Sequence, residues 1–182
     1  MGEGDPEGVE GAAVATKLKS KNEDPNMTSD LKPGDPAPDF DLPGDEGRIS
    51  LAALKGKTVV LYFYPKDDTS GCTAEAQAFT HGTADFAAAG AVVVGVSKDS
   101  VERHGRFRAK YGLAPLLASD KDGDVVERYG AWVEKSLYGR KYMGIERCTF
   151  LIDGQGVVRL VWRKVKVTGH VAEVLEAARA LR

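Results

Sequence analysis

The residues with the clearest chemical potential lie between residues 64 and 75, where a cysteine follows a strand-like segment. The order Tyr-Pro-Lys-Asp-Asp-Thr-Ser-Gly-Cys-Thr-Ala-Glu places Cys72 in the first turn of a predicted helix. Helix N-terminal amides favour an anion there, and the thiolate is the nucleophilic form of cysteine. Pro65 fixes the loop, Gly71 permits close backbone approach, and Thr69 can turn its hydroxyl toward the same pocket. A nucleophilic cysteine is the leading hypothesis; the alternative is a small buried residue, as most lone cysteines are.

The elements that must position Cys72 alternate between strand and helix. A continuous apolar run over residues 58–64 predicts a strand buried on both faces. A helical stretch follows from about Ser70 to Ala89, and a second buried strand covers residues 91–96. A strand, a helix and a second strand with short connections form a βαβ unit.

The second half of the chain completes an α/β pattern. Ser100 is predicted to cap a helix ending at Gly112, and Thr168 to cap the last helix. Between them the sequence predicts a short strand at 116–117, a turn at 120–124, a short helix ending near residue 130, and two strands, 147–152 and 157–163, joined by a hairpin at 153–156. This order predicts a thioredoxin-like α/β sandwich, with a central mixed β-sheet flanked by helices.

Composition limits the functional class and the domain plan. The 182 residues carry 25 Lys and Arg against 27 Asp and Glu, a balance that argues against a nucleic-acid binder. No apolar run approaches the ~18 residues of a membrane span. Residues 1–30, with seven acidic residues and no aromatic one, are predicted to be a disordered acidic tail, and Met27 offers an alternative start. Residues 31–182 form the predicted domain. Two isolated cysteines and scattered histidines predict a reducing, cytoplasmic location and no metal site.

Several blocks of sequence resemble one family. Pro65-x-x-x-Thr69-x-x-Cys72 is similar to the active-site signature of peroxiredoxins. Residues 59–69, 95–100, 142–147 and 161–167 resemble its peroxiredoxin Q, or bacterioferritin comigratory protein, branch. The resemblance runs from about residue 31 to the C-terminus.

The resemblance implies a thiol-dependent peroxidase that acts on hydrogen peroxide and organic hydroperoxides without a cofactor. Cys72 would attack the peroxide and become a sulfenic acid. The family's catalytic arginine corresponds to Arg147, which would stabilise the thiolate and the leaving oxygen; from sequence alone, a surface ion pair is the alternative. Thr69 would position the peroxide, Pro65 would shield the sulfenate, and Glu75 would orient Arg147.

The chain departs from the family at the resolving cysteine. Gln77 stands at the usual position, and the only other thiol is Cys148. Because neighbouring side chains of a strand point to opposite faces, Cys148 is expected to face away from the site that Arg147 faces. Cys148 is therefore a weak candidate for resolution and is preferred as a packed bystander. A one-cysteine enzyme follows, recycled by an external thiol such as thioredoxin, glutaredoxin or glutathione, and expected to be a monomer, with a dimer as the alternative.

Two other functions fit the same fold. A thiol–disulfide oxidoreductase normally needs Cys-x-x-Cys, whereas this chain has Cys72-Thr-Ala-Glu75. A non-catalytic holdase or binding module would need none of the active-site residues.

Overall fold

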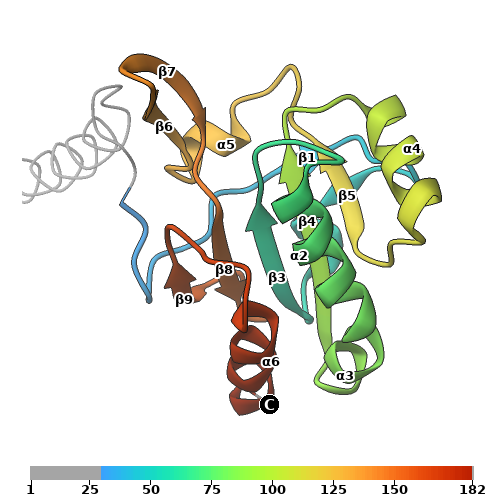
Figure 1. Cartoon of the computed structure of the whole chain (residues 1–182). Helices are drawn as coiled ribbons and strands as arrows, with labels where there is room; N and C mark the ends of the chain where they lie inside the picture. The colour runs from blue at the N-terminus through green and yellow to red at the C-terminus, as the bar shows by residue number, and fades with distance from the viewer. Residues whose placement is uncertain (1–29, 182) are drawn as a thin grey trace, which may run out of the picture.

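A five-stranded mixed sheet forms the centre of the molecule (Figure 1). The structure is a computed structural model that describes residues 30–181. The strands are β3 (Thr58–Phe63), β4 (Ala91–Ser97), β5 (Leu116–Ser119), β8 (Cys148–Ile152) and β9 (Val158–Trp162), in the spatial order β5-β4-β3-β8-β9. β3, β4 and β5 are parallel, whereas β8 runs antiparallel to β3 and β9 antiparallel to β8.

The composition of β3 explains its central place. Every residue of this strand after Thr58 is buried, as the continuous apolar run predicted. Successive side chains point to opposite faces, so Tyr62 packs on one side of the sheet and Phe63 on the other. The register pairs Phe63 with Val96 on β4 and with Cys148 on β8, which brings the start of β8 beside the C-terminal end of β3.

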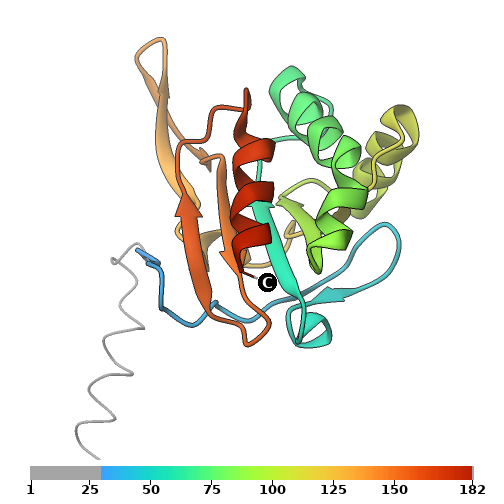
Figure 2. The same cartoon turned by 90° about the horizontal axis from the view of Figure 1, so that it is seen from below.

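Helices cover the sheet on both faces. α2 (Ser70–His81), α3 (Thr83–Ala88), α4 (Val101–Tyr111) and α6 (His170–Ala180) contribute to one hydrophobic layer, and α6 packs beside α2 and α3 (Figure 2). The short α5 (Val125–Arg128) belongs to the opposite layer. This arrangement confirms the predicted α/β sandwich with a central mixed sheet.

Two small sheets lie outside the central one. β1 (Asp41–Leu42) pairs with β2 (Ile49–Ser50), and the 3-10 helix η1 (Ala52–Leu54) follows. β6 (Trp132–Leu137) pairs with β7 (Arg140–Ile145) in a hairpin that projects from the body, at the same end of the sheet as the N-terminus of α2 (Figure 1). We call residues 132–145 the hairpin arm. Tyr138 and Gly139 form its two-residue turn, with φ of 52° and 76°, the left-handed conformation that such tight turns require.

Two predicted helix boundaries were wrong. The expected helix from Ser70 to Ala89 is interrupted at Gly82, and the Thr83 hydroxyl bonds to the carbonyls of Phe79 and Thr80 at the end of α2. The expected cap at Thr168 is not used, because the chain enters α6 through Gly169 at φ 77°.

The two ends of α4 are as predicted. The Ser100 hydroxyl accepts a bond from the Arg103 amide at 3.2 Å, and Gly112 ends α4 in the left-handed conformation. The predicted tail lies outside the described residues except for Asp30 and stays a prediction. Within residues 30–181, no helix is long and apolar enough to cross a membrane, and no three His, Cys, Asp or Glu side chains gather as a metal site.

Candidate active site

Cys72 lies in the first turn of α2, directly after the loop that leaves β3. The helix begins where the Thr73 amide donates to the Thr69 carbonyl at 2.8 Å. Cys72 is only 2% exposed and packs with Tyr62 and Phe79 in the layer beneath α2. The Cys72 side chain is therefore almost completely shielded from solvent.

Arg147 joins Cys72 to Glu75. Its Nη2 donates to the Cys72 sulfur at 3.3 Å, and its Nη1 donates to Glu75 Oε1 at 2.6 Å. Glu75 is three residues after Cys72, so both side chains lie on one face of α2, and Glu75 is fully buried. Arg147 immediately precedes β8, and the pairing of β8 with β3 brings it to the helix N-terminus. A Cβ on Gly71 would stand 3.1 Å from Arg147 Nη2, so the glycine makes room for the guanidinium.

Burial shifts the pKa values of Glu75 and Arg147 and so affects their charges. Burial raises the pKa of Glu75 to about 7, despite the opposing effect of Arg147. Burial alone would lower the pKa of Arg147, but Glu75 and the Cys72 sulfur outweigh it, and the net pKa is raised. The guanidinium thus keeps its charge while facing a sulfur and a carboxyl group. Such a donor stabilises a thiolate and an oxygen that gains negative charge beside it.

Comparison with known proteins places this geometry in a family. The model of the AhpC/TSA family matches residues 33–161. The chain belongs to that family. A putative peroxiredoxin bcp from Coxiella burnetii is 57% identical over 146 residues, which cover 80% of this chain and 97% of that protein. Peroxiredoxin Bcp from Bacillus subtilis is 50% identical, with 79% of this chain and 92% of that protein covered.

A solved structure supports the same assignment. The bacterioferritin comigratory protein of Xanthomonas campestris, studied for its alkyl peroxide reduction activity, superposes with a TM-score of 0.74 at 44% identity, covering 78% of this chain and 90% of that one. These findings confirm the peroxiredoxin Q resemblance, the thioredoxin-like fold and the function of a thiol-dependent peroxidase.

The other two signature residues of this peroxiredoxin lie on the loop before α2. Pro65 and Thr69 are both exposed. The Thr69 hydroxyl donates to the Lys66 carbonyl at 2.9 Å, so its proton is engaged within the loop and its oxygen remains able to accept. Thr69 is also the residue before the first turn of α2, where its side chain makes no cap bond.

A buried cluster that sequence reasoning missed holds this loop. Asp67, 2% exposed, accepts from the Tyr64 hydroxyl at 2.6 Å and faces His104 Nδ1 at 2.6 Å. The second ring nitrogen of His104 faces the Ala118 carbonyl at 3.0 Å. Since an oxygen and a nitrogen at 2.6 Å must share a proton, the Asp67–His104 contact contains one. His104 lies on α4 and is fully buried.

Cys148 is buried in a different part of the molecule from the Cys72 sulfur. Its side chain is fully buried in the layer on the opposite face of the sheet from Cys72. Burial raises the pKa of the Cys148 thiol to about 12, which keeps it protonated and unreactive near neutral pH. Both cysteines are free. Gln77, at the family's usual resolving position, is half-buried on α2.

Proposed function

We propose that this peroxiredoxin reduces hydrogen peroxide and organic hydroperoxides in a one-cysteine cycle centred on Cys72. The observation that carries the proposal is the guanidinium of Arg147, held by Glu75 and directed at the Cys72 sulfur. The alkyl peroxide activity of the Xanthomonas relative supports the same substrate class.

The oxidative half of the cycle uses the groups around Cys72. The thiolate attacks one peroxide oxygen, an S–O bond forms and the O–O bond breaks. The second oxygen leaves with a proton as water or alcohol, and Cys72 becomes a sulfenic acid. Arg147 stabilises the thiolate and the departing oxygen. The free lone pairs of the Thr69 hydroxyl accept a bond from the peroxide, and Pro65 limits solvent access to the sulfenate.

The reductive half needs a thiol from outside the chain. Gln77 offers none, and Cys148 lies on the other face of the sheet. An external thiol attacks the sulfenic acid, releasing water and forming a mixed disulfide, and a second thiol frees Cys72. Thioredoxin, glutaredoxin and glutathione are the candidate reductants. We also propose that the enzyme acts as a monomer in the cytoplasm, in cell redox homeostasis.

Trapping of the oxidised cysteine tests the proposal. Reduced protein receives one equivalent of hydrogen peroxide with and without dimedone, and the products are mapped by mass spectrometry. A dimedone adduct on Cys72 alone, with no disulfide, is the expected result. A Cys72–Cys148 bridge would replace the one-cysteine cycle with a two-cysteine one. Absence of oxidation at either residue would contradict peroxidase chemistry at this site.

Two assays on the same reduced protein distinguish the peroxidase from the two other functions. An oxidoreductase would reduce insulin disulfides without peroxide. A holdase would suppress aggregation of a client protein equally well as the Cys72→Ser variant.

A further inference from the structure

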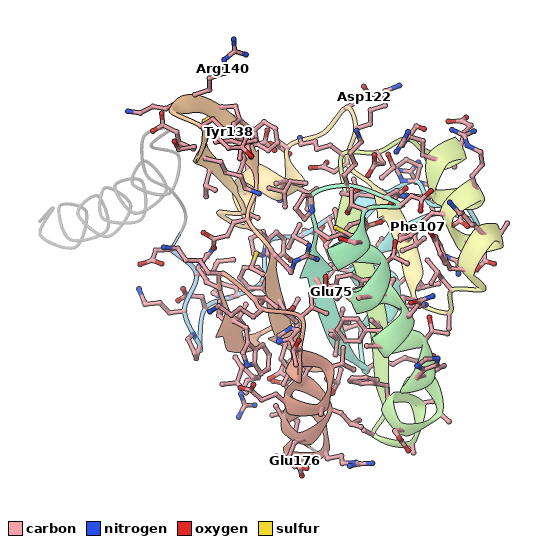
Figure 3. All side chains as sticks on the ribbon, viewed as in Figure 1. Glu75, Phe107, Asp122, Tyr138, Arg140 and Glu176 are labelled. Carbon is pink, nitrogen blue, oxygen red and sulfur yellow. The ribbon has the colours of Figure 1, made fainter. Side chains whose placement is uncertain are left out.

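The hairpin arm carries most of the large apolar side chains that the described residues expose. Tyr138 is 97% exposed, Leu137 55%, Met143 50% and Tyr142 48%. The fifth exposed large apolar residue of the described chain, Leu160 at 40%, is on β9. The register of the hairpin places Leu137 and Tyr142 on one face of the arm, together with Lys135 and Arg140, whereas Met143 pairs with Glu134 on the other face. Exposed apolar side chains gathered on one face are typical of an interaction surface. Figure 3 shows Tyr138 near the tip of the arm, with Arg140 extending beyond it.

The arm is continuous with the active site. β7 ends at Ile145, two residues before Arg147, and the Glu146 amide anchors the connection by donating to the Ala131 carbonyl at 2.7 Å. Lys135 on β6 lies half-buried, with its aliphatic carbons near Gly144. Burial lowers the pKa of Lys135, Arg147 lowers it further, and the Cys72 sulfur acts in the opposite sense.

The hairpin arm carries a net positive charge. Residues 132–145 contain Lys135, Arg140 and Lys141 against the single carboxylate of Glu134, a net charge of +2. A surface that combines exposed aromatic side chains with positive charge is complementary to an apolar surface rimmed by carboxylates.

We propose that the hairpin arm is the docking surface for a protein dithiol reductant, one whose reactive cysteine lies in an apolar surface edged by carboxylates. This assignment rests on the one-cysteine cycle proposed above, in which Cys72 needs an external thiol. The docked protein contacts the arm while its nucleophilic thiol attacks the Cys72 sulfenic acid. Water leaves, a mixed disulfide forms, and the reductant's second thiol displaces Cys72 as its own disulfide closes.

The size of the arm selects a protein over a small thiol. Six residues of strand extend about 20 Å, so a partner that contacts the arm along its length has the dimensions of a protein and not of a small thiol. The charge of the arm also disfavours a second copy of this chain, because a two-fold contact between arms would bring like charges together.

Arm variants separate docking from peroxide chemistry. The variants are Tyr138→Ser with Tyr142→Ser, and Arg140→Glu; Leu160→Ser is the matched control, an exposed apolar residue away from the arm. Three reactions are measured: single-turnover oxidation of Cys72 by peroxide, turnover with dithiothreitol, and turnover with a thioredoxin, its reductase and NADPH. We expect the arm variants to raise KM for the thioredoxin by about tenfold, while the first two reactions and Leu160→Ser stay within about twofold of wild type.

Several results would overturn the proposal. They are an unchanged KM for thioredoxin in the arm variants, equal loss in all three reactions, or recycling of the wild type by glutathione but not by thioredoxin. A dimer in sedimentation that the arm variants dissociate would assign the arm to self-association instead. Failure of the proposed function gives a different pattern, since wild-type Cys72 would then resist oxidation or bridge to Cys148 before any reductant is added.

Discussion

Replacement of Glu75 by glutamine isolates the electrostatics beneath Cys72, because the amide keeps an oxygen for Arg147 Nη1 and removes the titratable group. Burial raises the pKa of Glu75 from its ordinary value of 4.5 to about 7. At about 1.4 kcal/mol for each pH unit, this difference corresponds to about 3 kcal/mol. The folded protein keeps the proton up to about pH 7, whereas the unfolded chain loses it near pH 4.5. The stabilisation is therefore complete below pH 4.5 and is lost as the pH rises through 7.

Urea denaturation of wild type and Glu75→Gln across this pH range measures the effect. The free energy of unfolding of wild type, relative to the variant, should fall by about 3 kcal/mol from acid to neutral pH. Glu176→Gln on the exposed face of α6 is the control for loss of a glutamate. A flat difference would refute the role of burial at Glu75. A difference that rises with pH would show that attraction to Arg147 dominates and that the pKa of Glu75 is lowered.

Three further predictions follow from the contacts. Cys148→Ala should retain peroxide reduction within about twofold, because Cys148 is a protonated core thiol, whereas Cys72→Ala should abolish it. Loss of activity in a folded Cys148→Ala variant would assign Cys148 a catalytic step. Arg147→Lys should lower the second-order rate constant with peroxide, measured by stopped flow, by about 100-fold or more, since an ammonium cannot hold both partners; less than a tenfold loss would contradict this. His104→Phe should lower the free energy of unfolding in urea by about 3–5 kcal/mol, and adding Asp67→Asn should recover part of it, whereas additive losses would argue against a shared proton.

Local features of the site were predictable because they depend on residues close in sequence. The buried run of β3, the start of α2 after Thr69 and the cap at Ser100 follow from apolar periodicity and capping chemistry. Gly82 shows the limit of such reasoning. A glycine inside a helical pattern is compatible with continuation, and the break at this position depends on the Thr83 hydroxyl reaching back to the carbonyls of α2.

Contacts between residues distant in the sequence do not follow from local patterns: the pairing of Glu75 with Arg147 was expected only from the family resemblance, and that of Asp67 with His104 was not expected. Glu75 and Arg147 are 72 residues apart, and Asp67 and His104 are 37 apart. Only the pairing of β8 with β3 and the packing of α4 bring these side chains together. The arm was missed for another reason. Its strands are exposed along much of both faces, so residues 132–145 lack the alternation that marks a half-buried strand.

In the one-cysteine cycle proposed above, the burial of Cys148 on the other face of the sheet determines the rate law of the peroxidase. An internal resolving thiol would attack the sulfenic acid, release water and form a disulfide at a rate independent of any other molecule, whereas capture by an external thiol is bimolecular. The lifetime of the oxidised enzyme is then inversely proportional to the concentration of reductant. When that pool is depleted, each further peroxide competes for the sulfenate and converts it to sulfinic acid, an irreversible loss without a dedicated repair enzyme. Because the Cys148 thiol is buried in the core, the fraction of enzyme that stays active under peroxide then depends on the concentration of external reductant.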